Sequence, residues 1–137
     1  MIASLPKEVV MGLTVYGEAR GQPLEGQRAV AWVIRNRADH PCWWGSNIID
    51  VCLKKSQFSC WNADDPNYHI LINKETRTLP FIRALIKLCG SVLLDDPVND
   101  PTLGCNHYCT NSVIKKTKKK KNQKPAVIIG DHAFFKL

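Results

Sequence analysis

Long hydrophobic runs are missing from this 137-residue sequence. No apolar stretch approaches the roughly 18 residues that a membrane-spanning helix needs. The first residues, MIASLPKEVVMGL, also lack the basic start, the apolar block and the small-residue cleavage site of a secretory signal. We therefore expect no membrane span and no signal peptide, so that any export would use another route.

Paired cysteine spacing typical of a zinc site is also missing. Cys105, His107 and Cys109 lie close together, but they lack the usual two-residue spacing and a clear second pair. We therefore expect no bound metal. The chain has six cysteines, which allow many pairings. Without a secretory signal, reduced and mostly buried thiols are expected in preference to disulfides.

The excess of positive charge is concentrated in one place. The net charge is +7, and seven lysines lie in the stretch KKTKKKKNQK at 115–124, so the rest of the chain is neutral. A nucleic-acid binder would instead have a basic face with interleaved aromatic residues, and this block contains none. We expect this block to be an exposed loop, because its like-charged lysines repel one another. Contact with an anionic polymer, a membrane surface or nucleic acid is the alternative.

The composition is that of a soluble globular protein. Hydrophobic residues make up 45% of the chain and charged residues 23%. We expect a single domain over 1–137, large enough to bury a core without disulfides.

Apolar periodicity predicts three long helices, over Pro6–Ala19, Pro23–Arg37 and Leu79–Leu94. The first is apolar nearly all round, which is typical of a buried, central helix. Between the second and third helices we expect loops, with IIDVCLK as a short helix or turn and QFSCW as a short extended run. DDPVNDPTLGCNHYCT is expected to be a loop followed by a short extended piece, and the two short apolar runs around Gly130 are either strand or turn. The predicted fold class is α+β, mainly α.

Glu18 lies at the end of the first predicted helix, on the same face as Met11 and Val15. An apolar surrounding and the negative end of the helix dipole both raise the pKa of a carboxyl group. A raised pKa is what a proton donor near neutral pH needs. The positive charge of the nearby Arg20 is expected to lower the pKa of Glu18. By position alone, a structural or solvated role is the better explanation of Glu18.

Four blocks of sequence carry a resemblance to a known family. VYGEARGQPLEGQRAVAWVIRNR is followed by SQFSCWN, then by CNHY and then by IGDHAFF. In this order they resemble the cell wall hydrolases typified by spore cortex-lytic enzymes and related phage lysins. The blocks span nearly the whole chain, and the YGEARG block is the most specific.

The resemblance implies a small lysozyme-like domain that cuts peptidoglycan between N-acetylmuramic acid and N-acetylglucosamine, without a cofactor. It implies that Glu18 is the catalytic acid. The reaction would be that of a lytic transglycosylase or of an N-acetylmuramidase. The expected partner is the glycan strand, and the protein is expected to act as a monomer at the bacterial cell wall. A phage product released by a holin or carried in the virion fits this picture, and a bacterial origin is the alternative.

The same resemblance implies substrate contacts by the residues Gln57, Phe58, Ser59, His107 and Tyr108. If QFS is extended, Gln57 and Ser59 point to the same side and can hydrogen-bond a sugar. The alternative is that these side chains fill turns and the core. Trp43, Trp44 and Trp61 lie in predicted loops and either stack on sugar rings or fill the loop core; we count Trp61 among the substrate-binding residues.

Ordinary hydrolysis needs a second carboxylate about 5 to 9.5 Å from the acid. The candidates all lie in predicted turns or on helix surfaces: Glu25, Asp39, Asp50, Asp64 and Asp65. Caps and turns explain each of them, so a single-acid mechanism is simpler.

Some residues depart from the family pattern, namely Cys105, Asn106, Ala133 and Phe135. They affect fine substrate contacts and leave Glu18 unchanged.

The lysine block resembles an insertion in a variable loop that would attract anionic wall polymers. A non-catalytic wall-binding or virion structural module of the same fold is the rival interpretation, and a nucleic-acid binder is a weaker one.

Overall fold

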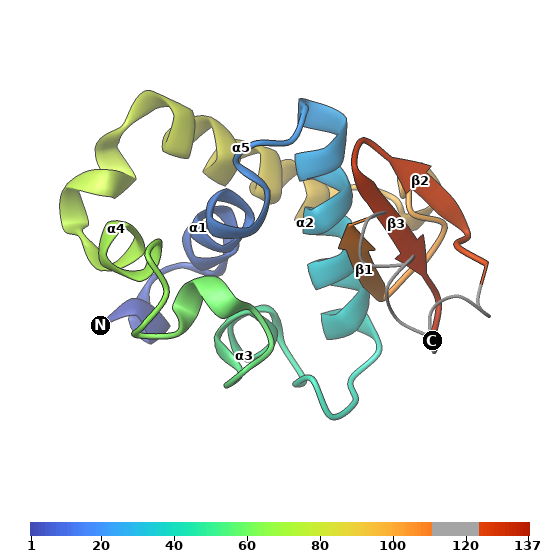
Figure 1. The fold of residues 1–137 in the computed structure, drawn as a ribbon, viewed down its shortest axis with the longest axis horizontal. Helices are drawn as coiled ribbons and strands as arrows, with labels where there is room; N and C mark the ends of the chain where they lie inside the picture. The colour runs from blue at the N-terminus through green and yellow to red at the C-terminus, as the bar shows by residue number, and fades with distance from the viewer. Residues whose placement is uncertain (111–123) are drawn as a thin grey trace.

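The computed structural model describes residues 1–110 and 124–137. Helices account for most of them, and a small sheet lies at one end of the molecule (Figure 1). The α+β fold class, with helix predominating, is therefore confirmed. The predicted lysine-rich loop at 115–124 lies outside the described residues except for Lys124. Within the described part of the chain, no helix is long and apolar enough to cross a membrane.

The central helix is α1 (Lys7–Ala19), as its apolar pattern predicts. It packs against α2 (Leu24–Asp39), α3 (Ile48–Leu53), α4 (Tyr68–Ile72) and α5 (Pro80–Leu94). The three long helices α1, α2 and α5 begin and end within two residues of their predicted bounds. The short helix predicted at IIDVCLK is α3, and Asn47 caps it by accepting a hydrogen bond from the backbone N–H of Asp50.

The prediction of an extended run at QFSCW is wrong. Ser56 adopts a left-handed backbone with φ of 64°, and the N–H of Gln57 donates to the carbonyl of Lys54. Ser59–Trp61 then form the 3-10 helix η2. The chain therefore turns where strand alternation was expected, because the left-handed Ser56 and the bonds of the Gln57 amide to two loop carbonyls decide its path. Gln57 and Ser59 do not share a strand face.

Short helical turns fill the remaining connections. They are η1 (Ile2–Ser4), η3 (Lys74–Thr78) and η4 (Pro97–Asn99), and with α4 they have no long apolar period that would predict them.

The sheet has the strand order β1-β3-β2, with antiparallel neighbours. Its strands are β1 (His107–Thr110), β2 (Val127–Ile129) and β3 (His132–Phe135), at the places where the sequence predicts strand-like pieces. Gly130, with φ of 59°, makes the turn between β2 and β3. On the face toward α2, Phe134 packs with Ala29 and Val33.

The C-terminal end of α2 anchors the sheet to the helical body. The Asn36 side-chain amide donates to the Asp100 carboxylate at 2.8 Å and to the Cys105 carbonyl at 3.0 Å. The Arg37 Nε donates to the Asn106 carbonyl at 2.7 Å. Both side chains are buried. These bonds fix the backbone just before β1, and so determine where β1 lies against α1.

All six cysteines are free thiols. Cys52, Cys60, Cys89 and Cys105 are buried, whereas Cys42 is exposed and Cys109 is partly exposed. Among the residues that the structure describes, no group of three His, Cys, Asp or Glu side chains is placed to hold a metal ion.

Candidate active site

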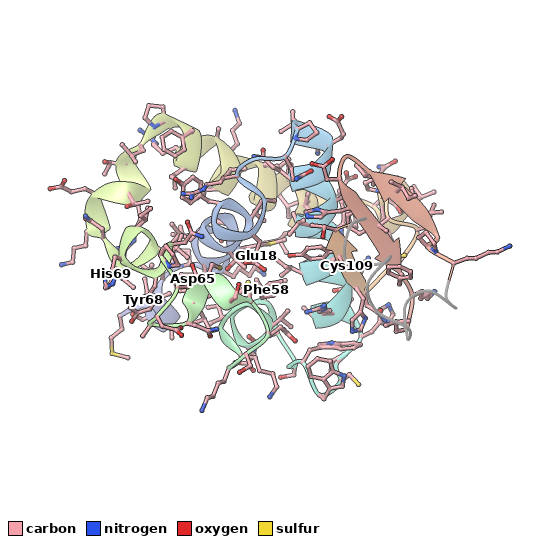
Figure 2. The ribbon with its side chains drawn as sticks, viewed as in Figure 1. Glu18, Phe58, Asp65, Tyr68, His69 and Cys109 are labelled. Atoms are coloured by element: carbon pink, nitrogen blue, oxygen red, sulfur yellow. The ribbon has the colours of Figure 1, made fainter. Side chains whose placement is uncertain are left out.

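Glu18 lies in the last turn of α1 and is partly buried. Met11 and Val15, which precede it on the same helix face, are fully buried. Figure 2 shows Glu18 near the middle of the molecule, between Asp65 on one side and Cys109 of β1 on the other. The expected apolar face is therefore present, and Glu18 stands at its open end.

The pKa of Glu18 is raised above its ordinary value. Burial is the largest cause, since it disfavours the charged carboxylate. The nearby negative charge of Asp65 raises the pKa further, whereas hydrogen bonds from Cys60 and Tyr108 lower it. Glu18 is therefore held toward the protonated form.

Tyr108 of β1 contacts Glu18, although 90 residues separate them in the sequence. Its hydroxyl donates to Glu18 Oε1 at 3.4 Å. Burial, and then the charge of Glu18, raise the pKa of the Tyr108 phenol well above its ordinary value, so the phenol stays protonated as a donor. The Tyr108 ring lies 5.0 Å from that of His132 and 5.9 Å from that of Phe134, centroid to centroid. The sheet thus holds the phenol in place.

Cys60 of η2 lies directly against the last turn of α1. It is almost fully buried, and its backbone N–H and thiol both interact with Glu18. A Cβ on Gly17 would come within 2.6 Å of Cys60 Cβ and 2.7 Å of its sulfur. A real Cβ atom essentially never comes this close to a non-bonded heavy atom. η2 can therefore approach the last turn of α1 this closely only because position 17 has no side chain.

Gln57 and Phe58 are turned into the loop. The Gln57 amide donates to the carbonyls of Val51 at 2.6 Å and Trp44 at 3.3 Å. Phe58 is buried, with the Arg37 guanidinium over its ring. Ser59 is exposed. Gln57 and Phe58 therefore build the wall that carries η2, and substrate contact by any of the three residues stays a prediction.

His107 and Tyr108 are neighbours on β1, so their side chains lie on opposite faces of the strand. Tyr108 faces Glu18, whereas the His107 ring lies 5.8 Å from Trp44 and 6.4 Å from Trp43. Trp44 is buried and Trp43 is exposed. His107 therefore belongs to a neighbouring aromatic cluster and does not lie beside the acid. Of the predicted site residues, Tyr108 is the one that the structure brings into contact with Glu18.

Trp61 stands at the edge of the site. Its indole N–H donates to the Thr14 hydroxyl of α1 at 3.0 Å, and its ring is partly buried against the core. Trp32, by contrast, is in the core of α2 as expected.

Among the candidate second carboxylates, Asp65 acts electrostatically on Glu18. Its Oδ1 also accepts the Asn67 backbone N–H at 2.8 Å, so it is a turn residue as the sequence suggests. Asp39 pairs with Arg35 at 3.2 Å, and the Asp50 carboxylate accepts from Asn47. Glu25 and Asp64 are exposed.

Sequence reasoning missed one neighbour of Glu18, Cys60, because only the folded chain brings it there. Asp65 was expected only as one of five possible second carboxylates, and the sequence did not single it out. Arg20, expected to oppose the raised pKa, instead turns its guanidinium to the Tyr16 ring and hydroxyl. The YGEARG block therefore contributes two features to the candidate site, the carboxyl group of Glu18 and the open space at Gly17.

The cell wall hydrolase family matches residues 21–135. This chain belongs to that family. It is therefore an enzyme that degrades peptidoglycan, as the motifs predict. The match contains η2 and the whole sheet but begins just after Glu18, so the role of Glu18 rests on its surroundings. No match was found among curated proteins or among solved structures.

Proposed function

We propose that this cell wall hydrolase cuts the glycan strand between N-acetylmuramic acid and N-acetylglucosamine, with Glu18 as its single acid and base. The observation that carries the proposal is the environment of Glu18. It is a partly buried carboxyl group with a raised pKa, reachable from solvent and fixed by hydrogen bonds from two other elements. These are the properties of a general acid that works near neutral pH.

In the proposed reaction Glu18 donates its proton to the glycosidic oxygen as the bond from that oxygen to the anomeric carbon breaks. The 6-hydroxyl of the same muramic acid residue then attacks the anomeric carbon. Glu18, now a carboxylate, takes the proton of that hydroxyl. The product has a 1,6-anhydromuramic end, and Glu18 is again protonated for the next cycle.

The three polar neighbours have distinct parts in this scheme. Burial and Asp65 favour the protonated acid, which the first step needs. The Tyr108 hydroxyl and Cys60 stabilise the carboxylate that forms when the proton has left. These groups act in opposite directions on the pKa of Glu18, which is raised overall, so the same carboxyl group is suited to give a proton in the first step and to take one in the second.

Hydrolysis by a muramidase mechanism is the second candidate, and Asp65 is the observation that favours it. Asp65 lies near enough to Glu18 to raise its pKa. It would act as the base that activates water. Against this role, one of its carboxylate oxygens is already bound by the Asn67 N–H. We therefore favour the single-acid mechanism.

Mass spectrometry of the muropeptides released from purified sacculi separates the two candidates. Transglycosylation leaves anhydromuramic ends, whereas hydrolysis leaves reducing ends that are heavier by one water. Asp65→Asn should still give anhydro ends. Reducing ends from the wild type, lost in Asp65→Asn, would establish the hydrolytic mechanism and overturn the single-acid proposal.

A further inference from the structure

A cavity of about 480 Å³ lies beside η2, outside the site at Glu18. Seven residues line it: Leu53, Lys54, Lys55, Ser56, Trp61, Asn62 and Ala63. This volume is within the roughly 300 to 1,000 Å³ range of small-molecule sites. The lining offers two ammonium groups, a hydroxyl, an amide and one wall of the Trp61 indole. It has no carboxylate.

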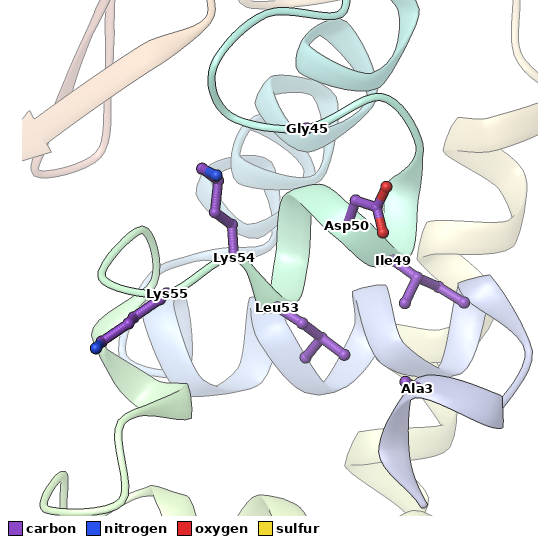
Figure 3. Close-up of a pocket in the computed structure, with 7 residues that line it drawn as sticks. All are labelled: Ala3, Gly45, Ile49, Asp50, Leu53, Lys54 and Lys55. Carbon is purple, nitrogen blue, oxygen red and sulfur yellow. The ribbon is translucent and has the colours of Figure 1, made fainter.

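The two lysines have no counter-ion within the part of the chain that the structure describes. Both are exposed, and they follow directly after α3. A second cavity, of about 460 Å³, adjoins the first along Leu53, Lys54 and Lys55. In Figure 3 both lysines reach out beyond the end of α3, on the side away from Asp50. The positive charge is therefore directed at solvent.

The backbone at this corner is held in an unusual conformation. Ser56 adopts a left-handed φ of 64°, which an L-residue other than glycine rarely adopts. Such strain is found preferentially at functional sites. Neither the Ser56 hydroxyl nor the Asn62 amide has a side-chain hydrogen bond to another described residue. Both groups are free to bind a ligand.

The cavity and Glu18 are linked through η2. Trp61 follows Cys60, which contacts Gly17 and Glu18, and the Trp61 indole is bonded to Thr14 of the same helix. η2 therefore supplies one residue, Cys60, to the surroundings of Glu18 and the next residue, Trp61, to the lining of the cavity. In peptidoglycan the groups that branch from the glycan strand are short peptides with free carboxylates.

We propose that the cavity of Lys54, Lys55, Trp61 and Asn62 binds the carboxylate-bearing peptide stem of the peptidoglycan strand. The ammonium groups pair with stem carboxylates, Asn62 and Ser56 hydrogen-bond the peptide backbone, and Trp61 packs on its aliphatic part. This inference rests on the proposed function, and it adds a preference for strands that still carry peptides.

The test compares two soluble glycan substrates from the same teichoic-acid-free wall, one with its peptide stems and one stripped of them by an amidase. Lys54→Gln/Lys55→Gln should raise KM on stem-bearing strands roughly fivefold to tenfold, and leave kcat unchanged. On stripped strands it should behave as wild type. Lys54→Arg/Lys55→Arg should restore most of the affinity. Lys74→Gln/Lys87→Gln, which removes the same charge elsewhere, is the matched control.

Three results would overturn the inference. These are no change on stem-bearing strands, an equal loss on both substrates, and an equal loss in the control variant. A difference seen only on walls that retain teichoic acid would assign the cavity to phosphate polymers and would also overturn it.

A binding measurement separates this inference from the proposed function. Stem peptide released by the amidase is titrated into the Glu18→Gln protein, and the Trp61 indole N–H signal is followed by NMR. We expect saturable shifts that Lys54→Gln/Lys55→Gln weakens. If the wild type cuts neither substrate but this binding occurs, the catalytic proposal fails and the cavity stands. If glycan is cut but the signal does not move, the cavity proposal fails alone.

Discussion

In the middle of α1, Val10, Leu13 and Val15 are completely buried, whereas Glu18 in the last turn of the same helix is only partly covered. The first region is held by apolar packing from several helices. The second is held by polar contacts from η2 and β1, elements distant in sequence. One helix thus combines a fully buried middle with an end at which a carboxyl group remains reachable from solvent.

If Glu18 is the general acid, as we propose, this difference shows how the fold would serve the chemistry. A general acid must be placed accurately and must change its protonation state, and these needs conflict in a uniform environment. Packing of the middle of α1 fixes the position of Glu18, and the mixed surroundings of the last turn set its pKa. Substitutions in the first region should therefore change stability, and substitutions in the second should change activity or its pH dependence.

Leu13→Ala should have the largest effect on stability. It removes a fully buried side chain from the middle of α1 and leaves a cavity. The expected loss in the free energy of unfolding is about 2 to 5 kcal/mol. Chemical denaturation measures the loss, and an assay corrected for the folded fraction should show near-normal activity per folded molecule. If the folded Leu13→Ala protein also showed a shifted pH profile of activity, the two regions of α1 would not be separate.

Gly17→Ala should affect both properties, because Gly17 lies at the boundary of the two regions. The new methyl group meets Cys60 at 2.6 Å, so η2 and the last turn of α1 must move apart. We expect a destabilisation of about 1 to 3 kcal/mol, with a clear fall in kcat. Gly21→Ala is the matched control, since its Cβ would meet nothing within 4 Å. Equal behaviour of the two variants would contradict the close approach of Cys60.

Tyr108→Phe should change the pH profile more than the stability. It removes a hydrogen bond that favours the Glu18 carboxylate, so the pKa of Glu18 should rise further. A general acid is active while protonated, and activity should therefore persist to higher pH on the alkaline side. The measurement is kcat against pH, with Tyr16→Phe as the control because the Tyr16 hydroxyl contacts Arg20 instead. A shift toward lower pH would contradict the assignment.

Asp65→Asn should give the smallest effect, a shift of the pH profile in the direction opposite to that of Tyr108→Phe. It removes a negative charge that raises the pKa of Glu18, so the alkaline limb of the profile should move to lower pH. Asp65 ranks last among the causes of the shift, and the movement should be smaller than that in Tyr108→Phe. Asp64→Asn, at the exposed neighbouring position, serves as the control. Identical profiles for the two asparagine variants would remove Asp65 from the site.

The sequence was sufficient to predict the parts of the fold that have a long apolar period. The helices α1, α2 and α5 are such segments, and the position of Glu18 after Met11 and Val15 follows from the same spacing. The two apolar runs around Gly130 could be located as well, although the sequence left them open between strand and turn, and the structure makes them β2 and β3. In these segments local pattern and tertiary packing require the same structure.

The path from Gln57 to Trp61 could not be predicted in the same way. Its turn depends on the left-handed Ser56 and on the Gln57 amide, which bonds to two carbonyls elsewhere in the loop. The contact of Cys60 with Glu18 depends in turn on that path and on the missing side chain of Gly17. Such contacts are made by tertiary structure, and no local period in the sequence reports them.

The central claim, that Glu18 is the acid, is tested most directly by measuring muropeptide release from purified sacculi by Glu18→Gln. The substitution keeps the size of the side chain and removes its proton transfer. We predict that release falls by roughly 100- to 10,000-fold, whereas the unfolding transition and co-sedimentation with sacculi are retained. Release by a folded Glu18→Gln protein at the wild-type rate would contradict the account and assign the acid to another residue.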